Sequence, residues 1–298
     1  MKEIKGIIVP ILTPMHEDET VNYEELVNQI ERLIAAGVHG IFVFGTNGEG
    51  YILDEEEKAR SSVWRLRPST AACRFTQVQA ASAPVIRFVC PEKPRNWGRM
   101  CSPSLRRALL QPPKKNSSSI MRRLQTQWIC RSCCTTSPPA RATLWPLHSA
   151  KAVSGGKHCG AKDSSGNFDN ILQYIEKTRG GDKPFTVLSG NDSLILWTLL
   201  AGGKGAIAGC ANVFPHTMVS IYEKFTAGDL EEARRAQDSI RPFRDIFKFG
   251  NPNTIVKTAV KELGYPVGLC RAPFNSLSPA GLDALRKALQ TCRDNGLC

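Results

Sequence analysis

The stretch "GAKDSSGN", Gly160 to Asn167, decides how the rest of the chain is interpreted. It begins with small residues typical of the end of a buried strand, and it runs into polar residues that can begin a helix. A helical pattern follows directly in "FDNILQYIEKTRGG". A strand, a turn and a helix in this order predict one unit of an α/β fold, with Lys162 where the strand ends.

The same alternation continues on both sides of a central segment. Before it, two strand–helix units are predicted from "GIIVPILTP", "NYEELVNQIERLIAAG", "GIFVFG" and "LDEEEKAR". After it come "FTVLSG", "SLILWTLLAGG" and "GAIAG", and then helical patterns alone, around "HTMVSIYEKFTAG", "DLEEARRAQDSIRPFRDIFK", "NTIVKTAVKELG" and "SPAGLDALRKALQ". This order predicts a (β/α)8 TIM barrel over residues 1–225 and a C-terminal helical domain over residues 226–298.

The central segment, residues 61–159, follows neither a helical nor a strand period for long. A closed barrel needs eight strands, and the flanks supply about five. We therefore expect the middle third of the barrel to be disrupted, with few strands in this segment. A structureless insertion of such length is unusual in a compact domain.

The charge of the chain is concentrated in the same segment. The net charge is +12, but residues 60–159 hold 18 Lys and Arg against one acid, Glu92, which is +17 and leaves −5 for the rest. The flanks are therefore mildly acidic, which argues against a nucleic-acid-binding protein. No run of about twenty apolar residues predicts a membrane span, and the N-terminus lacks a secretory pattern, so we expect a soluble, cytoplasmic protein.

Four motifs in the flanks resemble the dihydrodipicolinate synthase and N-acetylneuraminate lyase family of pyruvate-dependent class I aldolases. They are "GTNGEG" at Gly45–Gly50, "GAKDSSGN", "LSGND" followed by "GAIAGCANVFP", and "NPNTIVKTAVKELGYPVGLCRAPF" near the end. Each is moderately specific, but their order along about two thirds of the chain is a strong signal.

The resemblance implies a lyase or synthase that forms a lysine Schiff base with pyruvate and joins it to, or cleaves it from, an aldehyde co-substrate. Lys162 would form the Schiff base, because a desolvated amine loses its proton more readily and can attack a ketone. Thr46 and Asn47 would hold the carboxylate of pyruvate, and Gly190 and Ile207 would line the pocket beside the lysine. The resemblance implies no cofactor and no metal, and it implies a homotetramer.

The family's proton-relay tyrosine, expected in a "YN-x-P-x-x-TG" stretch before the lysine, is missing from the chain. Its slot holds Thr135, and Ala140 stands near the expected position of the arginine that grips the second substrate in some members. Threonine cannot exchange protons near neutral pH as a phenol in a relay can. The activity of the chain as it stands is therefore doubtful.

A frame-shifted translation of residues 61–159 explains this departure. In a reading frame shifted by one base, each codon combines the last base of one printed codon with the first two bases of the next. The codons of Trp128 and Ile129 must then give Asp, those of Cys133 and Cys134 must give Leu, and those of Cys134 and Thr135 give Tyr or His. The following codons permit the rest of the missing tyrosine motif, and with a single base missing just before Gly160 the stretch "GKHCGAKD" permits "ENIVGAKD". A genuine divergent insertion is the alternative.

Two other function classes remain open. A catalytically dead protein of the aldolase fold would keep the barrel and lose the chemistry. A basic, cysteine-rich zinc-binding or nucleic-acid-binding module is suggested by "CRSCC" with His148, His158 and Cys159, although these lack the paired spacing of known zinc frameworks. The acceptor aldehyde is open as well: aspartate semialdehyde, N-acetylmannosamine or a sugar-acid fragment would all suit the resemblance.

Overall fold

The computed structural model describes residues 4–63, 73–78, 86–91, 134–136, 160–181 and 185–297. Six strands form one sheet in the order β2-β1-β8-β7-β6-β5, and every pairing in it is parallel. These strands are β1 (Gly6–Pro10), β2 (Gly40–Phe42), β5 (Cys134–Thr136), β6 (Gly160–Asp163), β7 (Thr186–Ser189) and β8 (Gly205–Ile207). The sheet is the α/β core that the alternating pattern predicted.

The central segment adds little to this sheet within the described residues. Strands β3 (Cys73–Val78) and β4 (Ile86–Pro91) pair with each other in antiparallel register and form a separate two-stranded sheet. Only β5 joins the parallel sheet, at its edge beside β6. This arrangement agrees with the expected disruption of the middle third of the barrel.

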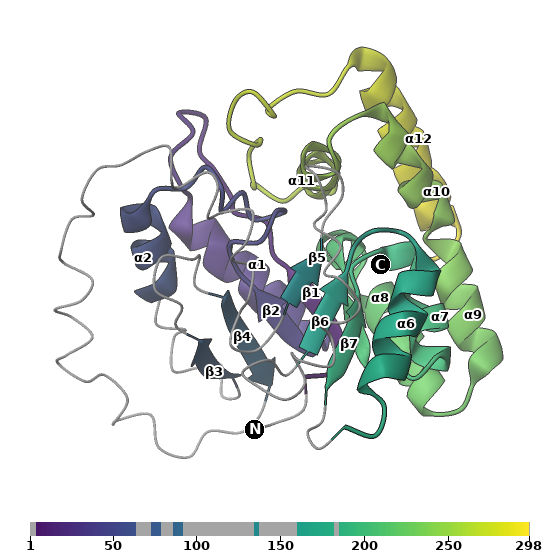
Figure 1. Cartoon of the computed structure of the whole chain (residues 1–298). Helices are drawn as coiled ribbons and strands as arrows, with labels where there is room; N and C mark the ends of the chain where they lie inside the picture. The colour runs from purple at the N-terminus through teal and green to yellow at the C-terminus, as the bar shows by residue number, and fades with distance from the viewer. Residues whose placement is uncertain are drawn as a thin grey trace, which may run out of the picture.

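The helices follow the predicted order along the chain (Figure 1). They are α1 (Tyr23–Ala35), α2 (Glu55–Val63), α6 (Phe168–Thr178), α7 (Ile195–Leu200), α8 (Pro215–Thr226), α9 (Leu230–Ser239), α10 (Arg241–Arg244), α11 (Pro252–Glu262) and α12 (Pro279–Asp294), with 3-10 turns η1 (Asp192–Leu194), η2 (Gly209–Asn212) and η3 (Asp245–Phe249).

The helical pattern around "DLEEARRAQDSIRPFRDIFK" is divided between two helices in the structure. The first, α9, ends at Ser239, and the second, α10, starts at Arg241. Pro242 stands in the first turn of α10. Proline has no backbone N–H and its ring crowds the preceding turn, so it is accommodated at the beginning of a helix and not in its interior. After this break, α10 and η3 each contribute a residue, Arg244 and Phe247, to the pocket described below.

One hydrophobic core joins the sheet to the C-terminal helices. Ile7 of β1, Leu33 of α1, Phe214 before α8, Ile255 of α11 and Leu289 of α12 are buried members of a single cluster. Each such side chain contributes roughly 1.5–3 kcal/mol by leaving water. The C-terminal helices are therefore packed onto the barrel elements, and the division at residues 225 and 226 stays a prediction. Among the described helices, none is long and apolar enough to cross a membrane.

Candidate active site

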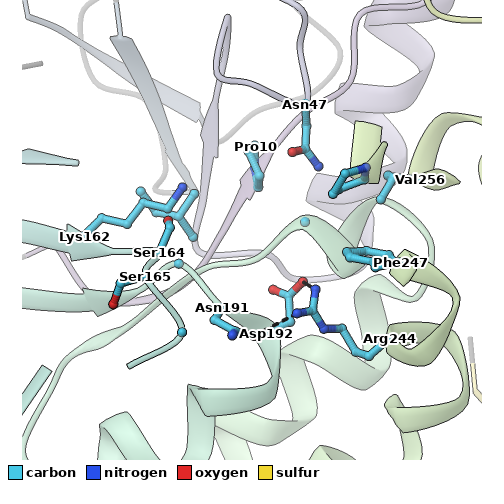
Figure 2. Close-up of a pocket in the computed structure, with 15 residues that line it drawn as sticks. Pro10, Asn47, Lys162, Ser164, Ser165, Asn191, Asp192, Arg244, Phe247 and Val256 are labelled. Carbon is cyan, nitrogen blue, oxygen red and sulfur yellow. Dashed lines mark hydrogen bonds and ion pairs between the residues drawn. The ribbon is translucent and has the colours of Figure 1, made fainter. Parts of the chain in front are cut away.

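A pocket of about 330 Å³ opens at the carboxyl ends of the parallel strands (Figure 2). This is the end at which TIM-barrel enzymes carry their active sites. Strands, the loops after them, and α10, η3 and α11 all contribute to its wall. Its lining comprises Pro10, Asn47, Lys162, Ser164, Ser165, Gly166, Gly190, Asn191, Asp192, Ile207, Gly209, Arg244, Phe247, Pro252 and Val256.

Lys162 lies in β6 and reaches into this pocket (Figure 2). Its neighbours Ala161 and Asp163 are buried, and Lys162 itself is half-buried. The Asp163 carboxylate accepts hydrogen bonds from the backbone N and hydroxyl of Ser165, at 2.9 and 2.6 Å. These hydrogen bonds fix the turn after β6, so the backbone of Lys162 is held rigidly at the end of the strand.

Gly190 lies directly against the lysine side chain. A Cβ atom added to Gly190 would stand 2.5 Å from Lys162 Cε, well inside van der Waals contact. The Gly190 N–H also donates to the carbonyl of Asp163 at 2.6 Å, which joins the ends of β6 and β7. Glycine is therefore the residue that leaves room for Lys162 to cross the pocket.

Substitution Gly190→Ala should displace Lys162 and lower the rate of imine formation with a keto acid by about a hundredfold. A shift of about 1 Å in a reacting group typically costs that much. Borohydride trapping of the imine over time measures the rate, and thermal melting checks that the fold is kept. Trapping at the wild-type rate in a folded Gly190→Ala protein would contradict this placement of the glycine.

The "GTNGEG" turn brings only one of its two predicted binding residues to the pocket. Asn47 lines the pocket, whereas Thr46 is exposed and is not among the lining residues. The turn is closed by backbone bonds from Glu49 N to the Thr46 carbonyl and from Gly50 N to the Gly45 carbonyl, at 3.1 and 3.3 Å. The Thr46 side chain accordingly faces solvent, and its predicted contact with a carboxylate stays a prediction.

Ile207 and Thr135 lie in other strands of the same sheet as the lysine. Ile207 in β8 is 2% exposed and packs with Ile8, Phe42 and Leu188 in a small buried cluster. Thr135 in β5 is the Cα partner of Lys162 in the parallel ladder. The slot of the expected tyrosine is thus next to the lysine along the sheet, while Ala140 lies outside the described residues.

The far wall of the pocket carries an arginine that the sequence did not single out. Arg244 comes from α10, and its Nη1 lies 3.7 Å from Asp192 Oδ2. Its Nη2 donates to Asn191 Oδ1 at 2.9 Å, and its Nε donates to Ser193 Oγ at 3.2 Å. The guanidinium also lies over the ring of Phe247, with Cζ 4.5 Å from the ring centroid. Figure 2 shows this group opposite Lys162.

Two polar atoms in the pocket lining lack a hydrogen-bond partner within the described part of the chain. They are Asp192 Oδ1 and Ser164 Oγ, and both are buried. The other oxygen of Asp192 accepts the backbone N–H of Cys210 at 3.0 Å, and burial together with this carboxylate raises the pKa of the Cys210 thiol. Buried polar atoms are usually paired, so these two are suited to polar groups of a bound molecule.

No metal site accompanies the pocket among the residues that the structure describes, since no three His, Cys, Asp or Glu side chains there are grouped to hold an ion. Cys130, Cys133, His148, His158 and Cys159 of the alternative zinc reading lie outside the described residues.

The model of the "Dihydrodipicolinate synthetase family" matches residues 3–62 and 152–292 of this chain. The chain belongs to this family. The unmatched interval, residues 63–151, lies within the segment for which a frame-shifted origin is predicted. The two matched blocks contain all four motifs quoted above.

Curated relatives agree with this membership. The 4-hydroxy-tetrahydrodipicolinate synthase of Methanoculleus marisnigri is 32% identical over 300 residues, covering 96% of this chain and 98% of the relative. The protein of the same name from Methanopyrus kandleri is 29% identical over 294 residues, covering 97% and 96%. The chain therefore spans nearly the whole length of these relatives.

Solved structures agree in fold. A prophage protein of the dihydrodipicolinic acid synthase family from E. coli K12, solved in complex with pyruvate, superimposes with a TM-score of 0.72 at 20% identity, covering 99% of both chains. Dihydrodipicolinate synthase from Aquifex aeolicus superimposes with a TM-score of 0.71 at 22% identity, again covering 99% of both. These likenesses identify the TIM-barrel α/β fold.

Proposed function

We propose that this protein is a class I aldolase. It forms a Schiff base between Lys162 and pyruvate, and it joins the enamine derived from this Schiff base to an aldehyde. The observation that carries the proposal is the position of Lys162 at the carboxyl end of β6, inside a pocket shared with Asn47, Gly190 and Ile207. Family membership supports the same chemistry.

The proposed reaction begins at the amine of Lys162. The unprotonated amine of Lys162 attacks the ketone carbon of pyruvate, and loss of water gives an iminium. The iminium withdraws electrons, so a methyl proton leaves and an enamine forms. The enamine carbon then bonds to the aldehyde carbon, whose oxygen takes up a proton, and water releases the product from the lysine. Asn47 supports this role by offering an amide donor to the pyruvate carboxylate.

The part of the pocket around Arg244 is suited to binding the aldehyde. Arg244 and Asp192 offer donors and acceptors opposite the lysine, and Ser164 offers a hydroxyl beside it. Curated relatives are named 4-hydroxy-tetrahydrodipicolinate synthase, which makes aspartate semialdehyde the first acceptor to assay. N-acetylmannosamine and sugar-acid aldehydes complete the panel. The family resemblance further supports a cytoplasmic homotetramer with a barrel over residues 1–225 and a helical domain over residues 226–298.

The test is chemical trapping in the full chain. Pyruvate with borohydride should attach a three-carbon unit to Lys162, located by peptide mass spectrometry, and pyruvate without reductant should attach none. Product formation with each aldehyde of the panel then identifies the acceptor. If Lys162 stays unlabelled at saturating pyruvate both in the folded chain and in its frame-corrected form, this function is ruled out and a catalytically dead aldolase fold is favoured.

A frame-shifted origin of residues 61–159 is the second part of the proposal. It is supported by the interval of the chain that the family model does not match, residues 63–151. It is also supported by the antiparallel pairing of β3 and β4 outside the parallel sheet. We expect the encoding DNA to show one change of reading frame after about Ala59 and a second change, just before Gly160, that restores the original frame. The frame-corrected protein should be more soluble than the present chain, because completed strands cover apolar sheet edges. An uninterrupted frame in independent isolates would refute this origin.

A further inference from the structure

Two opposite charges are buried together behind the pocket. Glu49 of the "GTNGEG" turn is 0% exposed and Lys257 of α11 is 1% exposed. Lys257 Nζ lies 2.7 Å from Glu49 Oε1. Glu49 Oε2 accepts the backbone N–H of Arg271 at 2.9 Å. Removing two charges from water is costly, and such a pair is stable only where geometry and further hydrogen bonds are good. Because this desolvation free energy is large, the ion pair is expected to have a role beyond ordinary packing.

The turn that carries Glu49 needs an external support. Phe44 and Glu49 have φ angles of +59° and +54°, in the left-handed region that side chains other than glycine rarely adopt. Conformations of this kind persist only where surrounding contacts enforce them, and they gather at functional sites. The carbonyl of Gly48 accepts a bond from Thr13 Oγ1 at 2.7 Å, and the carboxylate of Glu49 is held at both oxygens. The turn is therefore fixed from two sides.

The ion pair connects two walls of the pocket without touching its interior. Asn47, two residues before Glu49, lines the pocket, and so does Val256, the residue before Lys257. Asn47 also lies close against η2, since a Cβ added to Gly209 would stand 3.0 Å from its Nδ2. Neither Glu49 nor Lys257 is among the lining residues. A movement of α11 away from the turn would consequently move the Asn47 amide.

We propose that Glu49 and Lys257 are positioning residues, whose buried ion pair holds the "GTNGEG" turn against α11 so that the pocket is preformed for the carboxylate of a keto acid. The C-terminal helices thereby take part in substrate binding through a residue that never contacts the substrate. This inference rests on the proposed function for its substrate, but its structural half stands on the ion pair alone.

The first measurement compares Lys257→Met with Lys261→Met. Both replace a lysine of α11, but Lys261 is exposed. Labelling of Lys162 by pyruvate and borohydride is followed against pyruvate concentration. Lys257→Met should raise the half-saturating concentration about ten- to hundredfold and leave the labelling plateau unchanged, because a displaced donor weakens binding. Lys261→Met should match the wild type. Wild-type half-saturation in a folded Lys257→Met protein would overturn the proposal.

A second variant separates positioning from stability. Lys257→Met alone leaves a buried, unpaired carboxylate, which can unfold the protein, whereas replacing both partners with apolar residues often restores stability. Glu49→Leu combined with Lys257→Met removes both charges but leaves the Arg271 N–H without its acceptor, so it should regain most of the melting temperature that Lys257→Met loses and still require more pyruvate. A double variant that melts and binds as the wild type does would refute the positioning role.

Hydrogen exchange makes the result independent of the proposed function. Backbone amides of residues 45–50 should exchange faster in Lys257→Met than in Lys261→Met, without pyruvate present. If the wild type is never labelled, the proposed function fails while this comparison still decides the positioning role. Equal exchange in the two variants would show that the ion pair does not hold the turn.

Discussion

Lys162→Arg should abolish labelling by pyruvate and borohydride and reduce turnover by about four to six powers of ten, the loss typical of removing a covalent nucleophile. Arginine keeps the positive charge and a similar bulk, but its guanidinium does not lose a proton in proteins and cannot form an imine. Because Lys162 is half-buried at a strand end, the longer planar group should be accommodated with little effect on folding. Peptide mass spectrometry and steady-state rates measure the two effects.

Lys177→Arg is the matched control for this result. Lys177 lies in the last turn of α6 and is exposed, so its replacement should leave labelling and turnover unchanged. Melting curves of both variants should coincide with that of the wild type. Persistent labelling of the chain in Lys162→Arg would show that another lysine carries the Schiff base.

The position of Lys162 was predictable because the signal is local. Small, apolar residues lead into a polar turn and an amphipathic helix within a few residues of the lysine, so the strand end can be read without knowledge of the rest of the fold. The outcome at Thr46 is different. Residue type identifies a tight turn at "GTNGEG", but it does not tell whether Thr46 or Asn47 lines the pocket, because the turn includes left-handed φ angles at Phe44 and Glu49 that no sequence pattern predicts.

Arg244 and Lys257 were missed for a related reason. An arginine in a helical pattern normally predicts a solvent-exposed position, but in the structure Arg244 of α10 contacts Asn191 and Asp192. Lys257 stands within the apolar run "TIVKTAV", and its partner Glu49 is 208 residues away in sequence. A charge inside such a run is the available signal, since a buried lysine requires a partner.

The central segment limited the prediction in a different way. Its sequence carries no period, so strands could be neither located nor paired from it. The structure describes β3, β4 and β5 there, and only β5 joins the parallel sheet. The register of β5 beside β6 shows that Thr135 is the direct partner of Lys162, which sequence spacing alone could not predict.

Thr135→Tyr should raise the rate of the reaction with pyruvate by about two to four powers of ten, the usual contribution of a positioned proton-transfer group. Conversion of the iminium to the enamine requires a proton to leave the methyl carbon, and a phenol in a relay can accept and return it. Paired residues of a parallel ladder share one face of the sheet, and Thr135 is paired with Lys162. Exchange of pyruvate methyl protons with deuterated water, followed by NMR, measures this step without any acceptor aldehyde.

Thr135→Phe isolates the hydroxyl from the ring in the same experiment. It adds an aromatic side chain of nearly the same size but no ionisable proton, so the exchange rate should stay near that of the unmodified chain. Labelling of Lys162 by borohydride should be similar in both variants, because imine formation precedes the proton transfer. If phenylalanine accelerated exchange as much as tyrosine, the gain would come from filling space beside the lysine. If neither did, the slot of the relay would not be at position 135.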